Sequence, residues 1–388
     1  MTDTISAITK WRQYPIALII LTLIVFAPMA FVQSYVLTKA MADFSLHIMF
    51  AEQMKSGIAV APFTLAHAGW QILLLIFNAF GLSFPLANLI GILLCEAVTV
   101  FILLRWFWPS PDVLQPLWKT GIVLLGVSVA APISIFWPLD HQFYLGYIGI
   151  VTYHNPTIIL LRPFAILQFI FALKLFEPRP ISKFAILGMA IVSMLAAFAK
   201  PSFAICLIPA LGILVVLRML QKKDVDIPAF LIGFAIPTVL ILAVQFLITY
   251  QADNSGGILF APFTVMSYYS GLLLPKFFLS ILFPLLVTIV YRKQARQDIR
   301  MVLAWLIFIF GSFYTYFLAE GGQRFYDGNF TWSGEIGLFV LFVVSTLFFL
   351  DVSKPSTKSK LFLQFIWLGH VIVGIIYYGY FLTAHIYV

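Results

Sequence analysis

Three residues near the start of the chain have the types and spacing of an acid–base site. Asp43, His47 and Glu52 lie in a short polar stretch of a chain that is 62% hydrophobic and only 10% charged. In a helix over 42–56, Asp43 and His47 are one turn apart on the same face, where a carboxylate can accept a hydrogen bond from an imidazole. A partly desolvated carboxylate at a membrane face can remove the proton of an acceptor hydroxyl. We therefore predict that these three residues are catalytic.

Two other roles for the same residues stay open. Asp is a favoured N-cap residue, so Asp43 could only cap its helix, with His47 reaching into the membrane interface. A divalent metal bound by the carboxylates of Asp43 and Glu52 is an alternative that also stays open. The sequence has no His-Glu-x-x-His or paired-cysteine spacing, and it requires no cofactor.

Four basic residues have the chemistry to bind the phosphate of a substrate. Arg162 lies in an apolar segment, where an arginine needs an anionic partner and its planar guanidinium suits phosphate. Lys200, Lys276 and Arg324 are expected at the same membrane face and complete the predicted phosphate site. The alternative for Arg162 is an ion pair with Glu96. The two residues are expected at different depths, which favours phosphate.

Aromatic and polar side chains are interleaved over 320–335, a pattern that suits sugar binding. A sugar needs an aromatic face for stacking and convergent hydrogen bonds, although aromatic residues also form interface belts. Polar residues from three other loops are expected at the same face. The residues predicted to bind the sugar or the acceptor are His67, His141, His154, Asn155, Tyr326, Asp327, Asn329 and Trp332.

Apolar segments repeated along the whole length must position these residues. The mean hydropathy is +1.03, and segments of about 20 apolar residues match the thickness of a hydrocarbon core. We predict an all-α polytopic membrane protein with a single domain, 1–388. About eleven spans are expected, at 14–37, 85–106, 116–136, 156–176, 183–199, 202–219, 227–250, 272–291, 301–318, 335–351 and 361–383.

The distribution of basic residues predicts the orientation of these spans. With the N-terminus in the cytoplasm, most of the 23 Lys and Arg residues fall in cytoplasmic loops, as the positive-inside rule requires. Most carboxylates and the loop histidines then face outward, and the C-terminus is extracytoplasmic. We expect an integral protein of the bacterial cytoplasmic (inner) membrane whose active face is the outer one. The net charge of +8 indicates this topology rather than nucleic-acid binding.

The first outer loop, 39–84, contains a second candidate for a span. Residues 67–80 are apolar, but a crossing there would invert every later span and move the basic clusters outside. We predict instead a helix in the outer interface, ended by Gly81 before Pro85 starts the second span. The loop then carries interface helices and forms part of the active site.

Residues 1–110 resemble the GT-C superfamily of integral-membrane glycosyltransferases. The resemblance rests on a first span with a basic start, an outer loop with Asp43 shortly after it, the run from His67-Ala68-Gly69-Trp70 to Ser83, and a second span ending in Leu-Leu-Arg105. The chain looks most similar to the branch of protein O-mannosyltransferases and the aminoarabinose transferase of lipid A.

This resemblance implies an inverting sugar transfer at the outer membrane face. The expected donor is a polyprenyl-phosphate sugar, and the expected acceptor is a glycan, a lipid or a protein. Asp43 matches the family's first-loop carboxylate and is the expected general base. Membrane lipid and further membrane subunits are the other expected partners.

Two other functions stay open. A transporter or flippase of a lipid-linked sugar would use polar groups near the bilayer midplane, where this sequence offers only Glu96 and His370. An inactive GT-C-like scaffold subunit is the other, because the carboxylate that follows Asp43 is the distant Glu52. The sequence has no glycine-rich phosphate loop and no serine elbow, so it does not favour a function driven by nucleotide hydrolysis.

Overall fold

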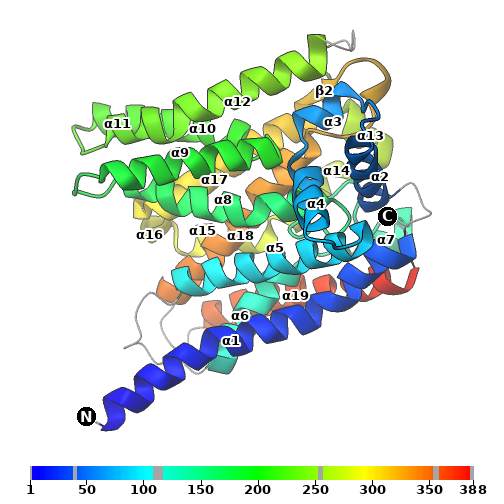
Figure 1. Cartoon of the computed structure of the whole chain (residues 1–388). Coiled ribbons are helices and arrows are strands. Elements are labelled where there is room, and N and C mark those ends of the chain that lie inside the picture. The colour runs from blue at the N-terminus through cyan, green and yellow to red at the C-terminus, as the bar shows by residue number, and fades with distance from the viewer. Residues whose placement is uncertain (1, 38–41, 108–116, 252–256, 353–357, 385–388) are drawn as a thin grey trace.

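Helices make up most of the structure (Figure 1). The computed structural model describes residues 2–37, 42–107, 117–251, 257–352 and 358–384. Within these ranges, seven helical segments are long and apolar enough to cross a membrane. The chain is therefore an all-α polytopic membrane protein, as predicted. The segments are α1 (Thr2–Phe31) with η1 (Val32–Val36), α5 (Phe84–Phe107), α8 (Pro156–Lys174), Ile227–Tyr250, α17 (Ile299–Phe317), α18 (Thr331–Val352) and α19 (Lys358–Ala384).

The other predicted spans are shorter or broken helices. The pair α14 (Leu273–Ser280) and α15 (Leu282–Val290) is bent by 62°. Three further helices have fewer than the ~20 residues of an untilted span: α6 (Leu117–Val129), α9 (Lys183–Ala199) and α10 (Ala204–Leu220). Every predicted span thus contains a helix or a pair of helices, although the boundaries differ. The count of about eleven crossings stays a prediction.

The predicted span 116–136 extends too far at its C-terminal end. The helix α6 stops at Val129, because Pro132 disfavours the helical conformation at Ala131. The backbone N–H of Ala131 donates instead to the carbonyl of His370 in α19, at 3.1 Å. An irregular segment then leads through the short α7 (Trp137–Asp140) to α8.

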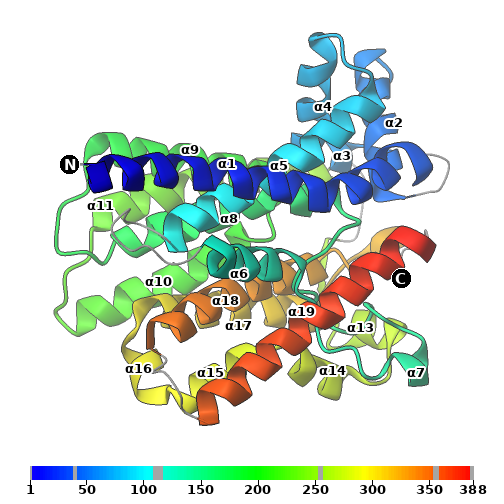
Figure 2. The same ribbon diagram turned by 90° about the horizontal axis from the view of Figure 1, so that it is seen from below.

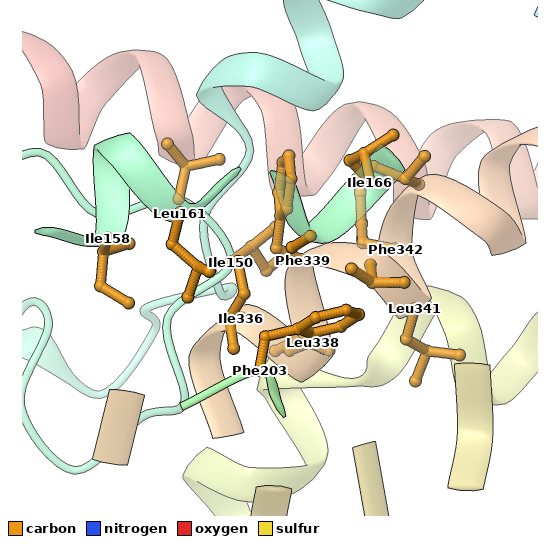
Figure 3. Packing of buried hydrophobic residues seen from close by; sticks show 14 of the residues in the cluster. Ile150, Ile158, Leu161, Ile166, Phe203, Ile336, Leu338, Phe339, Leu341 and Phe342 are labelled. Atoms are coloured by element: carbon orange, nitrogen blue, oxygen red, sulfur yellow. The ribbon is translucent and has the colours of Figure 1, made fainter. Parts of the chain in front are cut away.

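The helix α18 lies at the centre of the bundle. All its residues from Trp332 to Phe349 are buried, and it is apolar on every side, as expected of a helix surrounded by others. Figure 3 shows Leu161 and Ile166 of α8 in one apolar cluster with Phe339 of α18. Gly311 permits the close contact of α17 with α18, since a Cβ there would lie 2.4 Å from the Ser333 carbonyl oxygen.

The bundle has two different ends. In Figure 1, α1 begins at the left and α19 ends at the right. The helices α2 (Asp43–Lys55), α3 (Pro62–Ala66), α4 (Gly69–Ala79), α7 and α13 (Thr264–Tyr269) gather at the right, which we name the α2 end. The opposite end carries α16 (Arg292–Gln297) and many of the basic residues.

The predicted outer loop 39–84 forms a helical group at the α2 end, and Figure 2 shows this group beside the start of α5. Its residues 39–41 lie outside the described residues. At a rise of 1.5 Å per residue, α4 is roughly 17 Å long and is too short to cross a hydrocarbon core of about 30 Å. This length agrees with the prediction of an interface helix rather than a span.

A small two-stranded antiparallel sheet also lies at the α2 end. Strand β1 (Ile258–Phe260) follows the segment formed by α11 (Ile227–Phe230), η3 (Leu231–Ala235), α12 (Ile236–Phe246) and η4 (Leu247–Gln251). It pairs antiparallel with β2 (Leu318–Glu320), so that Ile258 lies opposite Glu320. The strand β2 directly continues α17 and leads into the short helix η5 (Gly322–Arg324), which places Glu320 and Arg324 beside the ends of the long helices.

Candidate functional site

Asp43 is the first residue of α2, and its carboxylate is bound by another helix. Ala42 occupies the N-cap position, and its carbonyl accepts a hydrogen bond from Ser45 Oγ at 2.8 Å. Asp43 Oδ2 accepts instead from Asn155 Nδ2 at 2.8 Å. The alternative in which Asp43 only caps its own helix is therefore wrong.

His47 lies one turn after Asp43 and is electrically neutral near pH 7. Burial lowers the pKa of His47 to about 4, although the Asp43 carboxylate acts in the opposite direction. Its Nδ1 has no hydrogen-bond partner among the described residues. A neutral imidazole can orient a bound hydroxyl, so the position of His47 suits substrate orientation better than proton removal.

Glu52 is not brought to Asp43. It is an exposed residue further along α2, and it lines neither of the two cavities described below. Within the described residues, no group of three His, Cys, Asp or Glu side chains is arranged to hold a metal ion. The geometry therefore does not support a divalent metal at Asp43 and Glu52.

A row of hydrogen bonds connects Asp43 to Lys200 across the start of α8. Asn155 is the N-cap of α8, where its Oδ1 accepts from the backbone N–H of Ile158 at 3.1 Å. Thr157 Oγ1 also donates to Asn155 Oδ1, at 2.7 Å. Lys200 Nζ donates to Thr157 Oγ1 at 2.9 Å. Asn155 and Lys200, predicted as two separate ligands, thus belong to one polar cluster with Asp43.

Lys200 follows the last turn of α9 and is the central cation of this cluster. The helix ends there because Pro201 favours an extended backbone in the preceding residue. Burial lowers the pKa of Lys200 to about 8, and the carboxylates of Asp43 and Glu335 oppose this change. Lys200 is therefore still mainly charged near pH 7.

A cavity of about 200 Å³, which we name the Lys200 cavity, has a polar end and an apolar side. Its polar residues include His67, Lys200, Arg324 and their neighbours. The apolar side is formed by α10 and α12, whose side chains are also exposed on the outside of the bundle. The lining residues used below are His67, Lys200, Ile205, Leu242, Phe246, Glu320, Arg324, Asn329 and Ser333.

Arg324 contributes a second positive charge to the Lys200 cavity. It pairs with Glu320 at 3.1 Å and lies with its guanidinium carbon 4.6 Å from the centre of the Phe63 ring. Asn329 Nδ2 donates to the same carboxylate oxygen, Glu320 Oε2, at 2.8 Å. Burial lowers the pKa of His67 to about 3, and the charges of Lys200 and Arg324 add to this effect. His67 therefore lines the cavity as a neutral side chain.

A second cavity of about 310 Å³, the Asp43 cavity, is acidic and aromatic. It exposes the carboxylates of Asp43, Asp327 and Glu335, and no Lys or Arg side chain lines it in the described part of the chain. Burial also lowers the pKa of His154, which lies in its wall. The aromatic lining consists of Tyr144, Tyr147, Tyr269 and Trp332.

Glu335 is the main site residue that the sequence does not predict. It is buried one turn into α18, where Tyr144 Oη donates to Oε1 and Thr152 Oγ1 donates to Oε2 at 2.6 Å. The signal available in the sequence was an acid at the start of an otherwise apolar span, because such an acid is costly unless it is used. Its hydroxyl partners come from the irregular segment before α8, which no sequence pattern marks.

The segment 327–335 forms a common wall between the two cavities. Residues 328, 331, 332 and 335 line the Asp43 cavity, whereas 329, 330 and 333 line the Lys200 cavity. Trp332 stands at this wall, with its ring centre 4.9 Å from Lys200 Nζ and 5.6 Å from the His154 ring centre. Trp332 at the start of α18 therefore lies between Lys200 and His154, which line different cavities.

The preference for phosphate over Glu96 as the partner of Arg162 is wrong. Arg162 Nη1 lies 2.7 Å from Glu96 Oε1, both side chains are buried, and Arg162 Nη2 also donates to the Thr152 carbonyl. The predicted depths differed because residue counts along two spans do not include their tilt and offset. The packed helices α5 and α8 bring the two side chains level.

Lys276 and His141 also lie away from the predicted site. Lys276 Nζ lies 2.5 Å from Asp140 Oδ2 and donates to the Leu145 carbonyl at 2.9 Å. Burial acts to raise the pKa of Asp140, but hydrogen bonds from Lys276, Gln142 and Ser270 lower it overall. His141 is an exposed residue with a left-handed backbone at φ 55°. Neither residue lines the two cavities, so neither supports its predicted role.

Tyr326 lies near the site but outside it. Its side chain is exposed and packs with the Tyr268 ring at a centroid distance of 4.8 Å. The neighbouring Asp327 does line the Asp43 cavity. Tyr326 therefore lies outside the site, whereas Trp332 is part of it. Both residues belong to the segment 320–335, so the sequence pattern could not distinguish their roles.

The chain matches no protein-family model, no curated protein and no solved structure. Its function has to be inferred from the residues and the geometry described above.

Proposed function

We propose that this protein is a GT-C-like membrane glycosyltransferase that moves a sugar from a polyprenyl-phosphate donor to an acceptor hydroxyl. The observation that carries this proposal is the pair of cavities with opposite charge on the two sides of segment 327–335. A reaction between an anionic lipid-linked donor and an acceptor that must lose a proton needs such a division.

The Lys200 cavity suits the phosphate of the donor. Lys200 and Arg324 supply two positive charges, and His67 is neutral. Arg324 is paired with Glu320 at 3.1 Å and with Asp327 at 3.5 Å, so Lys200 is the main cation for the phosphate. Leu242 and Phe246 provide an apolar side for the polyprenyl chain. Cations placed beside the phosphate stabilise the negative charge that develops on the leaving group.

The Asp43 cavity suits the acceptor. In the proposed step, the sugar of the donor extends past segment 327–335 into the Asp43 cavity, where the acceptor oxygen forms a bond to the anomeric carbon while the bond from that carbon to the phosphate oxygen breaks. The hydroxyl proton passes to Asp43, and the polyprenyl phosphate leaves with the bonding electrons. Aromatic rings such as Tyr144, Tyr269 and Trp332 offer stacking faces for the acceptor or for the transferred sugar.

We further propose that the α2 end faces outward from a bacterial inner membrane, with the N-terminus in the cytoplasm. The basic residues of 174–183, 218–223 and 292–300 lie in turns at the opposite end, and the positive-inside rule assigns such turns to the cytoplasm. The acceptor is then an extracytoplasmic glycan, lipid or protein, and membrane lipid or other subunits are the remaining partners.

Binding of farnesyl phosphate to the purified protein in lipid nanodiscs tests the donor site. The wild type is expected to bind this short polyprenyl phosphate, and Lys200→Gln to bind it about 10- to 100-fold more weakly, the usual range for a lost hydrogen bond to a charged group. Glu52→Gln, an exposed change outside both cavities, is the matched control. Equal affinity of wild type and Lys200→Gln would overturn the proposed donor site.

A further inference from the structure

The contacts between Lys200 and Asp43 form a row of four side chains that we name the α8 ladder: Lys200, Thr157, Asn155 and Asp43. The three side-chain contacts measure 2.9, 2.7 and 2.8 Å in this order. Thr157 and Asn155 are buried at the first turn of α8. Because Asn155 is also the N-cap of α8, the helix itself holds the ladder in place.

All donors of the α8 ladder point the same way. The Lys200 ammonium donates to the Thr157 hydroxyl, the hydroxyl donates to the Asn155 carbonyl oxygen, and the Asn155 amide donates to Asp43. Hydrogen bonds arranged in one direction polarise one another, most of all between a cation and an anion in a site shielded from water. The charge of Lys200 therefore influences the electron density of the Asp43 carboxylate.

The ladder joins the two cavities through protein rather than through open space. Lys200 lines one cavity and Asp43 the other, and neither Thr157 nor Asn155 lines either cavity. An asparagine amide does not readily pass a proton onward, because the proton would leave it as an imidic acid. The ladder thus transmits orientation and polarisation, not a proton.

We propose that the α8 ladder couples the cavities, so that an anion bound at Lys200 releases the Asp43 carboxylate to accept the proton of the acceptor. This inference rests on the proposed function and adds an order of events to it. A phosphate beside Lys200 compensates the ammonium charge and weakens the polarisation of Thr157 and Asn155. Asp43 then becomes a stronger proton acceptor only when the donor is present, which protects the empty enzyme from a misplaced reaction.

Difference infrared spectra of the full-length protein in nanodiscs test this coupling. Addition of farnesyl phosphate is expected to shift a carboxylate stretching band that is absent from Asp43→Asn. Thr157→Val keeps the shape of the side chain but removes the middle of the ladder, so it should bind farnesyl phosphate and show no shift of the Asp43 band. Thr157→Ser, which keeps the hydroxyl, should restore the shift.

Thr238→Val is the matched control. Thr238 is another buried threonine in an apolar helix, and its hydroxyl has no partner among the described residues. This variant should behave like the wild type. An unchanged Asp43 band in wild type with bound farnesyl phosphate, or an equal shift in Thr157→Val, would overturn the coupling while leaving the donor site intact. Failure of the wild type to bind farnesyl phosphate would instead overturn the proposed function and this inference with it.

Discussion

The Lys200 cavity and the Asp43 cavity share a wall but differ in almost every physical property. The first is lined by two cations, by Glu320 and by an apolar side from α10 and α12, whereas the second is lined by three acidic residues and four aromatic rings. Different residues of 327–335 face one cavity or the other, so the turn before α18 and the first residues of this helix form both boundaries. The proposed function therefore depends on the charge separation between the two cavities rather than on any single residue.

The largest expected effect concerns the Asp43 cavity alone. Asp43→Asn removes the proposed base but keeps an oxygen that can accept from Asn155 Nδ2, so sugar transfer should fall by about 10²–10⁴-fold. Farnesyl phosphate should still bind, because Asp43 does not line the Lys200 cavity, and any change in its affinity measures the reciprocal coupling through the α8 ladder. Parallel transfer and binding assays measure both results. Equal transfer rates before and after the change would show that Asp43 is not the base.

A second change acts outside both cavities and should affect the stability of the fold. Glu96→Gln leaves the buried Arg162 charge without its counterion, and loss of one partner of such a pair costs about 3–5 kcal/mol of unfolding free energy. Reversible unfolding in mixed detergent can measure the loss. Asp351→Asn, which removes a partly exposed partner of Arg300, is the control and should cost roughly 1 kcal/mol or less. Similar losses in the two variants would contradict the assigned role of the Arg162–Glu96 pair.

The smallest expected effect is a pH dependence confined to the Lys200 cavity. The pKa of Lys200 is lowered by burial to about 8, so its ammonium charge is present below this pH and is lost as the pH rises through it. Farnesyl phosphate affinity should therefore fall by about tenfold per pH unit above pH 8, since one proton is required. A Kd series across this range measures the fall. Lys200→Arg should not show it, because a guanidinium stays charged there, and an identical fall in Lys200→Arg would assign the titration to another group.

The sequence predicts the helices and much of the polar site because both depend on local patterns. Apolar periodicity predicts the spans, and Pro201 and Asn155 mark two helix ends. At these ends, hydrogen bonds through Thr157 and Asn155 connect Lys200 to Asp43. The structure places His67 in the Lys200 cavity and His154 and Trp332 in the Asp43 cavity, all three from segments that the predicted topology assigns to one face. These residues could be assigned to a common end of the bundle without knowing any contact between helices.

The errors concern pairings between helices. Residue counts could not reveal that Glu96 and Arg162 lie at one level, or that Asp140 neutralises Lys276. Glu335 and its partner Tyr144 are far apart in the sequence and meet only through the packing of α18 against the irregular segment before α8. Such pairs depend on tilt, offset and loop course, which a single sequence does not encode in any local pattern.

The most direct test of the central claim is a structure of the protein with farnesyl phosphate bound in lipid nanodiscs. We expect density for the phosphate within hydrogen-bonding distance of Lys200 Nζ, with the isoprenoid chain against Leu242 and Phe246. Phosphate density in the Asp43 cavity, or at a site away from both Lys200 and Arg324, would contradict the division of labour between the two cavities.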